Sequence, residues 1–434
     1  MTMSEKARIV FVNRFFFPDT SATAQLLSDL AFALASSRFE VHVVCSRQLY
    51  ADPDAKLLPR ESIRGVRVHR VASTRFGRAR LPGRAIDYAS FYLTAGWTLA
   101  RLLRRRDVLI AETDPPLISL VACLAAGLRR ATLVNWLQDV FPEVASRLGA
   151  NPLPPVLDRS LRVLRDASLR AARCNVVLGE RMRDYIVGRV PQARCRIIEN
   201  WADTGGVTVV PAERSELRQR LGLTGRFVIG YSGNLGRAHE FDTLLGAARL
   251  LPPEVAFLFI GGGQKHRKLE ARVAQEGLRS FYFAPYQPRE SLSDSLAAAD
   301  VHWVSLLPSL EGLIVPSKFY GVLAAGRPVL FIGDEQGELA RVINATGCGA
   351  VIKAGDSPAL ARIIEALRSD PYEVHRMGSV ARQLICNRYG MSAAIDHWIA
   401  LLTEVQSQEA QPHPHVRAEG ARAGRSAVPP RSAP

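Results

Sequence analysis

The chain has 434 residues, of which 47% are hydrophobic and 22% are charged. These ordinary values for a globular protein exclude a mostly disordered chain, a coiled coil and a collagen. No uncharged apolar run reaches about 18 residues, which excludes a polytopic membrane protein. The formal net charge of +15 predicts an anionic partner, such as a phosphate-bearing substrate, nucleic acid or an acidic membrane surface.

The six cysteines lie far apart and include no CxxC pair, so neither a metal site nor a disulfide framework is predicted. The N-terminal residues MTMSEKARIVFVNRFF contain no apolar segment followed by a small-residue cleavage site. We therefore expect buried thiols in a reducing compartment and a protein that stays in the cytoplasm.

The first half of the chain predicts a parallel sheet. A β-branched strand, Arg8–Asn13, is followed by a helix over Gln25–Ala35 and a second strand, Glu40–Cys45. Strand, helix and strand within about forty residues form a βαβ unit. Further strands are predicted at Val66–Val71, Val108–Ala111, Thr132–Trp136 and Asn175–Leu178.

The same pattern begins again in the second half. It predicts a strand over Phe227–Tyr231, a helix over Asp242–Leu250 and a strand over Ala256–Ile260. Later elements are a strand at Val301–Ser305, a helix at Lys318–Ala325 and a strand at Pro328–Ile332.

The two α/β patterns flank Ile198–Arg226, where we place the domain boundary. The prediction is an α/β protein with two doubly wound domains, residues 1–200 and 201–405, that face each other across a cleft. The last helix of the second domain could pack back on the first. Residues 406–434, rich in Gln, Pro, Ala, Arg and Gly, predict a disordered tail.

Much of the positive charge falls in one segment, because residues Arg60–Arg106 contain twelve arginines and two acids. Aromatic residues at helical spacing, from Tyr88 to Trp97, accompany the arginines. A basic helix with aromatic side chains suits the headgroup level of an anionic membrane. The alternative is a core helix with solvated arginines at its ends. Nucleic acid is not expected, since no recognised binding motif accompanies the charge.

The loop Phe15–Ala24 carries the first candidate site. Ser21, Ala22 and Thr23 are small residues at the start of a helix, where free N–H groups favour an anion or an acceptor. Simple capping of the helix by Thr20 or Ser21 is equally compatible with this loop.

Asn135–Glu143, with the sequence NWLQDVFPE, follows a predicted strand directly. Asp139 would lie at the carboxyl end of that strand, where α/β sheets place their site residues. Its carboxylate could orient an acceptor hydroxyl or act as a base. A structural capping role before Pro142 is the alternative.

The first loop of the second domain, YSGNLGRAHEF, combines Gly233 and Gly236 with Arg237. Glycines let the backbone approach a phosphate, and the arginine supplies charge. The dinucleotide fingerprint GxGxxG is absent. A second glycine run, residues 261–263, ends the next predicted strand and is followed by Gln264 and Lys265. This run is predicted to point into the same cleft as the first loop.

The most specific motif is Glu311–Val329, EGLIVPSKFYGVLAAGRPV. Pro316 leads into a short helix that opens with Ser317 and Lys318, so a helix N-terminus and an ammonium group coincide. An ordinary junction between helix and strand is the alternative.

Taken together, FPDTSATAQLLSDLA, QDVFPE, YSGNLGRAH and PSKFYGVLAAGRPV resemble glycosyltransferase family 4, a group of retaining enzymes with the GT-B fold. The resemblance is closest to the bacterial exopolysaccharide and O-antigen members, such as colanic acid and fucosamine transferases. With their spacing, the motifs cover the chain from Arg8 to about Leu402.

The resemblance implies a nucleotide-sugar donor in the second domain and an acceptor in the first. It implies that Asp139 faces the reacting sugar, that Glu311 is the first acid of a paired-glutamate motif, and that Tyr286 lies near the base. The catalytic set is then Asp139, Arg237, Glu311 and Lys318. The donor-binding set is Gly233, Asn234, Gly236, Arg237, Lys265, Tyr286, Ser317 and Lys318.

This chain departs from the family pattern in two places. The second glutamate is missing, since Phe319 or Gly321 stands at its position, and Glu338 is a candidate to hold the donor ribose instead. Asn234 and His239 replace the arginine and lysine of the usual phosphate clamp, which leaves Arg237 and Lys318 as substitutes. Glu311 is not expected to act as a nucleophile.

The function implied is retaining transfer of a sugar from a UDP- or GDP-sugar to a polyprenyl-diphosphate-linked glycan at the inner face of the cytoplasmic membrane. No cofactor or metal is expected, because the predicted cleft loops contain no DxD-like aspartate pair. An epimerase or hydrolase of the same fold, or a catalytically silent nucleotide-sugar-binding partner, are the alternatives.

Overall fold

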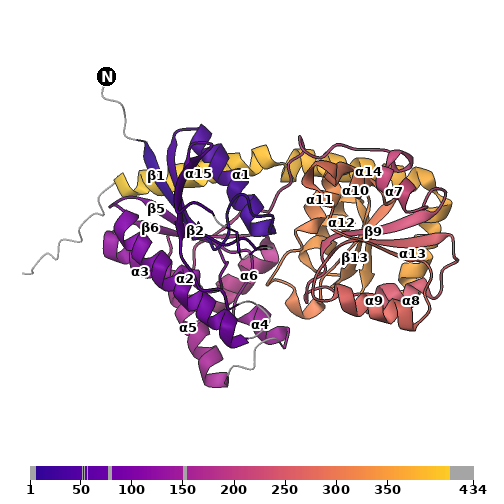
Figure 1. The fold of residues 1–434 in the computed structure, drawn as a ribbon, viewed down its shortest axis with the longest axis horizontal. Coiled ribbons are helices and arrows are strands. Elements are labelled where there is room, and N and C mark those ends of the chain that lie inside the picture. The colour runs from indigo at the N-terminus through magenta and orange to yellow at the C-terminus, as the bar shows by residue number, and fades with distance from the viewer. Residues whose placement is uncertain are drawn as a thin grey trace, which may run out of the picture.

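A computed structural model describes residues 6–410 except 51, 53, 56, 77–80 and 150–153. Two parallel sheets form its framework (Figure 1). The first sheet is parallel apart from the antiparallel pair β3–β4. Its strands in spatial order are β3 (Arg60–Ile63), β4 (Val66–Val71), β2 (Phe39–Ser46), β1 (Ala7–Val12), β5 (Val108–Ala111), β6 (Thr132–Trp136), β7 (Cys174–Val177) and β8 (Cys195–Ile197).

The second sheet is parallel throughout the described residues and has the 3-2-1-4-5-6 strand order of a doubly wound fold. Its strands in spatial order are β11 (Phe281–Ala284), β10 (Val255–Gly262), β9 (Phe227–Asn234), β12 (Val301–Ser305), β13 (Val329–Gly333) and β14 (Gly349–Lys353). The strand order reverses between β1 and β5 in the first sheet and between β9 and β12 in the second. Ligands of such sheets bind outside the carboxyl ends of the strands at these switch points.

Helices cover both faces of each sheet, as the continuously apolar central strands require. Those of the first domain are α1 (Ala22–Ser36), α2 (Leu81–Leu102), α3 (Ile118–Arg129), α4 (Glu143–Arg147), α5 (Pro155–Ala171) and α6 (Glu180–Arg189). The helices that follow β8 are α7 (Glu216–Arg220), α8 (Asp242–Ala248), α9 (His266–Gln275), α10 (Leu292–Ala297), α11 (Lys318–Ala324), α12 (Glu338–Thr346), α13 (Ser357–Ser369), α14 (Pro371–Leu384) and α15 (Met391–Ala410).

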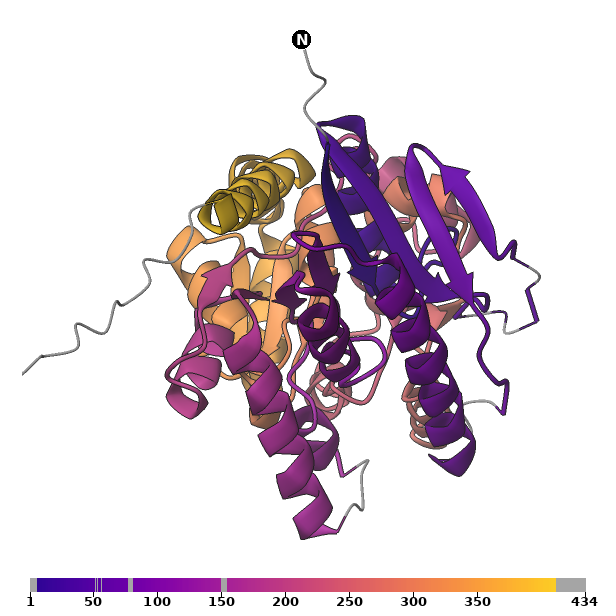
Figure 2. The same ribbon diagram turned by 90° about the vertical axis from the view of Figure 1, so that its left-hand side faces the viewer.

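The C-terminal helix α15 returns to the first domain. Its Trp398 ring meets Trp136 of β6 edge-on, with centroids 4.9 Å apart, and Trp136 stacks on Trp201 at 5.8 Å. Seen from the side of the first domain, α15 lies on one side of the sheet and α2 on the other (Figure 2). The helix reaches Ala410, so residues 406–410 are helical and not part of a tail. Residues 411–434 lie outside the described residues.

An apolar cluster joins the two domains. Leu137 and Val140, which follow β6, belong to the same buried cluster as Leu313, Val315 and Phe319 of the second domain. Burial of apolar side chains stabilises this contact by roughly 25 cal/mol per Å² removed from water. The segment that contains Asp139 is therefore held against the segment that precedes α11.

Most predicted strands and helices agree with the structure to within a residue or two. The main exception is β9, which continues past Tyr231 to Asn234 and carries the glycine loop into the sheet. The short strands β3, β8, β11 and β14 were not predicted. Each of them lies at or near a sheet edge, where the apolar signal is weak.

Candidate active site at the domain junction

Glycines shape the carboxyl ends of β9 and β10. Gly233 and Gly261 are register partners and have φ values of +126° and +128°. A Cβ atom on Gly233 would lie 2.9 Å from Cε of Lys318, and one on Gly261 would lie 3.1 Å from the Tyr286 ring. Glycine is required here because φ is positive and two side chains press on the backbone.

Lys318 begins α11, and its stem passes over Gly233. Its Nζ lies 5.5 Å from the centroid of the Tyr231 ring. Burial lowers the pKa of Lys318 to about 8, and no carboxylate among the described residues forms an ion pair with it. The described part of the chain therefore holds a half-buried cation beside two glycines and supplies no carboxylate to pair with it, which favours an anionic ligand.

A neutral histidine and a second lysine, which lies near Asp242 and Glu240, lie close to Lys318. His239, in the lysine position of the usual clamp, is buried, and its Nδ1 lies 2.8 Å from the carbonyl oxygen of Ser305. Burial and the neighbouring Lys318 lower the pKa of His239 to about 3, so the ring is neutral. The ammonium of Lys265 donates to the carbonyl of His239. Burial lowers the pKa of Lys265 as well.

The remaining donor candidates lie around the same glycines. Arg237 is exposed, and its Nε donates to Gln264 Oε1 at 2.6 Å, so its guanidinium is not part of an ion pair in the described structure. The carbonyl of Asn234 accepts from the Tyr231 hydroxyl at 2.8 Å. Gly236 donates its backbone N–H to that carbonyl. Ser317 is the N-cap residue of α11, and its side chain makes no capping hydrogen bond.

Tyr286 faces the first domain. Its ring lies against Gly261 and Gly262, and 60% of the residue is exposed. Burial of the hydroxyl and the neighbouring phenol of Tyr50 raise the pKa of Tyr286. Tyr50 follows β2, so the interaction places two aromatic side chains on opposite sides of the domain junction. Sequence reasoning missed Tyr50, because nothing in its local pattern sets it apart.

Asp139 connects the two domains through the backbone. It forms an isolated antiparallel bridge with Ile314, and the N–H of Val140 donates to the carbonyl of Leu313 at 3.0 Å. Ile314 precedes Lys318 by only a few residues, so the bridge brings the predicted carboxylate and the predicted cation to one junction. Burial and the charge of Asp114 raise the pKa of Asp139 to about 6, and its Oδ1 has no hydrogen-bond partner.

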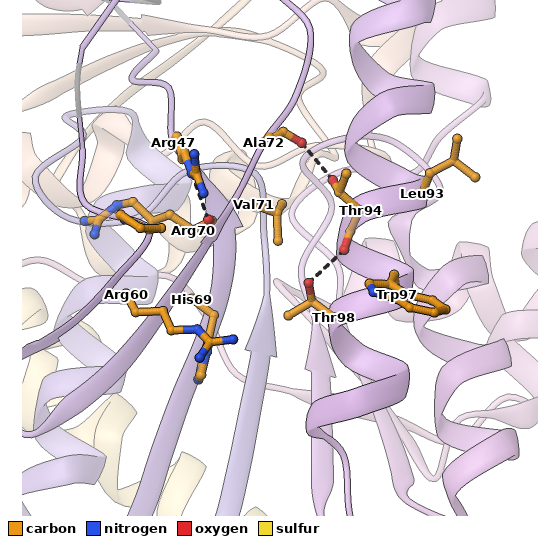
Figure 3. Close-up of a pocket in the computed structure, with 11 residues that line it drawn as sticks. Arg47, Arg60, His69, Arg70, Val71, Ala72, Leu93, Thr94, Trp97 and Thr98 are labelled. Atoms are coloured by element: carbon orange, nitrogen blue, oxygen red, sulfur yellow. Dashed lines mark hydrogen bonds between the residues drawn. The ribbon is translucent and has the colours of Figure 1, made fainter.

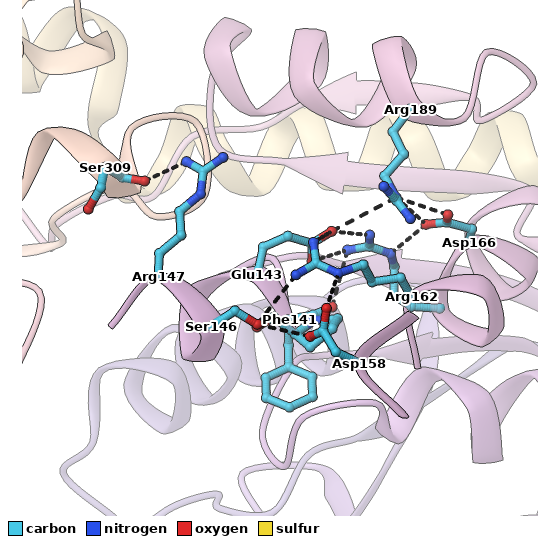
Figure 4. Close-up of polar contacts among 11 residues, drawn as sticks. Phe141, Glu143, Ser146, Arg147, Asp158, Arg162, Asp166, Arg189 and Ser309 are labelled. Atoms are coloured by element: carbon cyan, nitrogen blue, oxygen red, sulfur yellow. Dashed lines mark hydrogen bonds and ion pairs between the residues drawn. The ribbon is translucent and has the colours of Figure 1, made fainter. Parts of the chain in front are cut away.

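A buried ion network holds the Asp139 segment (Figure 4). The Glu143 carboxylate accepts from Arg165 at 2.8 and 3.1 Å and pairs with Arg162 at 2.9 Å. Arg165 also donates to the carbonyl of Phe141 at 3.1 Å. Burial acts to raise the pKa of Glu143, but the hydrogen bonds and the charge of Arg165 outweigh this effect. The pKa of Glu143 is therefore below its usual value. These arginines come from α5, which the motif did not include.

Glu112 is a second carboxyl group that the sequence did not single out. It follows β5, its N–H donates to the carbonyl of Val12 at 3.2 Å, and both carboxyl oxygens are buried without a hydrogen-bond partner. Burial, Asp114 and Asp139 raise the pKa of Glu112 well above its ordinary value. Glu112 therefore lies at the switch point of the first sheet with a pKa that burial raises well above its ordinary value.

Glu311 and Glu338 both accept hydrogen bonds at helix N-termini. Glu311 Oε1 accepts from the N–H of Glu338 at 2.8 Å, at the start of α12. Burial raises the pKa of Glu311, and that hydrogen bond opposes the shift. Glu338 Oε2 accepts from the N–H of Arg181, at the start of α6 in the first domain, at 2.8 Å. The same carboxylate pairs with Arg341 of its own helix at 3.4 Å. A role for Glu338 at the donor ribose stays a prediction.

The acceptor candidates lie at the start of α1. Ser21 has extended backbone geometry, its side chain does not cap the helix, and its Oγ has no hydrogen-bond partner. Asp19 accepts from the N–H of Ser21 at 2.8 Å. Capping of α1 by the Ser21 hydroxyl is not what the structure shows. Ala22 is exposed and Thr23 is half-buried.

Among the described residues, no group of three or more His, Cys, Asp or Glu side chains could hold a metal ion. A search of the same residues finds no helix that is both long and apolar enough to cross a membrane.

Comparisons with known proteins identify both domains as glycosyltransferase domains. Residues 22–201 match the family described as glycosyl transferase 4-like domain, and residues 213–384 match glycosyl transferases group 1. A probable glycosyltransferase of Pseudomonas aeruginosa, WbjE, is 29% identical over 70% of this chain and 76% of its own length. WcaI of Escherichia coli K12, a putative colanic acid biosynthesis glycosyl transferase, is 30% identical over 33% of this chain and 36% of its own length.

Solved structures show the same fold. The Anabaena protein HepE, crystallised with UDP-glucose, superposes with a TM-score of 0.68 over 92% of this chain and 99% of its own, at 18% identity. WaaG, a glycosyltransferase involved in lipopolysaccharide biosynthesis, gives 0.65 over 91% and 99%, at 15% identity. With both domain families matched in order, the chain belongs to the GT-B glycosyltransferases that pair a family 4-like domain with a group 1 domain.

Proposed function

We propose that this glycosyltransferase moves a hexose from a UDP- or GDP-sugar to a hydroxyl of a lipid-linked glycan, with retention of configuration. The observation that carries the proposal is Lys318, a half-buried cation without an acidic ion-pair partner among the described residues, which lies over Gly233 beside the neutral His239. A diphosphate placed there would meet the ammonium, the exposed amides of the glycine turn and Arg237. Such preorganised positive groups stabilise charge that develops on a leaving group.

The step conserves atoms and charge. The bond between the anomeric carbon and the diphosphate oxygen breaks, and its electron pair leaves with the nucleotide. The acceptor oxygen forms the new bond on the same face and gives its proton to the departing phosphate. Lys318 and Arg237 neutralise the leaving group, while the ionised Asp139 lies opposite and stabilises positive charge on the sugar ring.

Asp139 suits this role because of how it is held. The bridge to Ile314 and the buried Arg165–Glu143 pair leave its backbone little freedom. With a pKa of about 6, its carboxylate is ionised at neutral pH. Its Oδ1 is buried and has no hydrogen-bond partner within the described chain, a state that a substrate hydroxyl reaching it would relieve.

The acceptor class follows from two lines of support. Of the similar proteins, WbjE is named a probable glycosyltransferase and WcaI a putative colanic acid biosynthesis glycosyl transferase; the name of WcaI supports a role in polysaccharide synthesis. The basic segment of residues 60–106 supplies charge for an anionic membrane surface, where a lipid-linked acceptor would be found. On this basis we place the enzyme peripherally at the inner face of the cytoplasmic membrane.

The test is a donor panel. Purified protein is incubated with UDP- and GDP-sugars, with and without a membrane lipid extract, and free nucleotide is measured. Nucleotide release that requires the extract supports transfer. Release or conversion without it indicates an epimerase or a hydrolase, and binding without turnover on any acceptor indicates a silent binding protein. If calorimetry detects no binding of any uridine or guanosine diphosphate compound, the proposal fails.

A further inference from the structure

A cavity of about 410 Å³ lies in the first domain, away from the glycine turns of the second (Figure 3). One wall is the outer edge of the first sheet, β3 and β4, with the residue that follows β2. The other wall is the middle of α2. The lining residues are Arg47, Pro59, Arg60, His69, Arg70, Val71, Ala72, Leu93, Thr94, Trp97 and Thr98.

The sheet wall of this cavity carries two guanidinium groups that no acid neutralises. Arg47 and Arg60 are exposed, and the ion pairs of the described residues include neither of them. Arg47 uses only its Nε, which donates to the carbonyl of Arg70 at 3.3 Å. Arg70 itself is satisfied by Glu61 and by the carbonyl of Phe17. The free charge of the cavity therefore comes from Arg47 and Arg60.

The neighbouring histidine adds no charge to the sheet wall. Burial and His42 lower the pKa of His69 to about 4, so the ring is neutral at physiological pH. Its Nε2 lies 3.0 Å from Nδ1 of His42. Phosphate oxygens are the natural partners of two unpaired guanidinium groups beside neutral polar atoms.

The helix wall of the cavity is apolar and exposed. Leu93 and Trp97 are one helical turn apart on α2, with 75% and 62% of their surfaces exposed. Phe91, Ala95 and Leu99 on the opposite side of α2 are buried in the core, which fixes the outward direction of the first pair. The Arg101 guanidinium lies 4.2 Å above the Trp97 ring. An exposed Leu–Trp pair rimmed by arginine suits the boundary between lipid headgroups and acyl chains.

The neighbouring helices also expose apolar side chains. α3 packs beside α2 and exposes Leu124 and Leu128, again one turn apart. α5 packs beside α3 and exposes Val163 and Leu164. Exposed large apolar side chains on three successive helices favour a surface that meets something other than water.

We infer that the cavity between β4 and α2 binds the phosphate of an anionic membrane phospholipid, with Leu93 and Trp97 inserted at the level of the acyl chains. The inference rests on the proposed function in placing the enzyme at a membrane, and it names the surface that contacts the bilayer. Arg47 and Arg60 take the headgroup phosphate, and the faces of α2, α3 and α5 lie toward the lipid. The cavity is proposed as a phospholipid site, separate from the site of the sugar acceptor.

Flotation of the full-length protein with vesicles tests the inference. The vesicles contain phosphatidylcholine with or without phosphatidylglycerol, and the variants are Arg47→Gln/Arg60→Gln and Trp97→Ala. Loss of two surface arginines is expected to weaken binding to the anionic vesicles about 30-fold at low salt. Trp97→Ala is expected to weaken binding several-fold while it leaves the salt dependence intact. Neither variant should change the binding of UDP or GDP measured by calorimetry.

Matched controls come from the second domain. Arg220→Gln/Arg279→Gln removes the same charge from exposed arginines, and Tyr372→Ala removes an equally exposed aromatic ring. Both controls should bind vesicles as the unmodified protein does. Inorganic phosphate and a short-chain, water-soluble phosphatidylglycerol separate a lipid site from a general phosphate site, because only the lipid should compete with vesicles at low concentration.

Three results would overturn the inference. One is undiminished flotation of Arg47→Gln/Arg60→Gln, and another is an equal loss in the charge-matched control. The third is competition by a single-stranded oligonucleotide at concentrations where the short-chain lipid does not compete, which would assign the surface to nucleic acid. Failure of the proposed transferase function looks different: nucleotide binding would be absent while vesicle binding still depended on Arg47 and Arg60.

Discussion

The sheets of the two domains reverse their strand order in the same way, but different side chains lie at the two switch points: lysines in the second domain and carboxyl groups in the first. At the carboxyl ends of β9 and β10 the chain places glycines with positive φ, Lys318 and Lys265. At the ends of β5 and β6 it places Glu112 and Asp139, whose pKa values are raised by burial and by the nearby Asp114. In the first domain, the guanidinium of the buried Arg14 lies 5.1 Å from the centroid of the Tyr88 ring.

This comparison shows that the fold supplies a location and the side chains supply its chemistry. An unpaired cation is suited to a diphosphate, and an unpaired carboxylate is suited to a hydroxyl or to a positively charged sugar ring. The bridge between Asp139 and Ile314 and the hydrogen bond from Val140 to Leu313 bring the two chemistries to one place. Changes on each side should therefore have separable effects.

The most severe change is expected on the acidic side. Asp139→Asn should lower kcat by about 10²–10⁴-fold, the usual size of a lost acid–base or charge-stabilising group. Donor affinity, measured by calorimetry, should change less than about threefold, since the diphosphate contacts lie in the other domain. The exposed Asp396→Asn on α15 serves as the matched control and should retain full activity.

The same substitution should stabilise the fold. The folded-state pKa of Asp139, about 6, lies above its ordinary 3.8, so ionisation at neutral pH costs stability that returns as pH falls through this range. Asp139→Asn should therefore raise the free energy of unfolding at pH 7 by up to about 3 kcal/mol. A variant that is both inactive and less stable would mean that the aspartate is structural.

On the basic side we expect a smaller loss. Lys318→Met keeps the stem over Gly233 but removes the charge, and Lys318→Ala removes both. Both variants should lower transfer at least about tenfold and weaken donor binding by a similar factor, because the ammonium stabilises the diphosphate. Lys353→Ala, at an exposed site, is the control. Near-normal turnover in the Lys318 variants would count against the assignment.

The smallest expected effect is on the pH dependence of activity, which depends on both Asp139 and Lys318. We expect kcat/KM to fall below about pH 6 as Asp139 gains a proton and above about pH 8 as Lys318 loses one. One unit beyond either pKa the loss should be about tenfold. Lys318→Arg should remove the alkaline limb, since a guanidinium stays charged there. An alkaline limb that persists in this variant would assign it to another group.

Local sequence patterns were sufficient for the framework and for the positions of the motifs. Runs such as Val108–Ala111 and Thr132–Trp136 coincide with β5 and β6, because strands buried on both faces must be continuously apolar. The loop that carries Asp139 and the glycine loops follow directly after strands, whereas Lys318 was singled out as the start of a short helix after Pro316. Lys318 and Asp139 could be named in this way without any knowledge of their surroundings.

What those residues contact was decided by the tertiary structure. Glu338 contacts Arg181 of the first domain, and Arg165 reaches Glu143 from another helix. Such pairs are far apart in the chain, so no local periodicity records them. The orphaned oxygens of Glu112 and the missing partner of Lys318 are likewise properties of packing, because only burial makes an unpaired charge or carboxyl group costly.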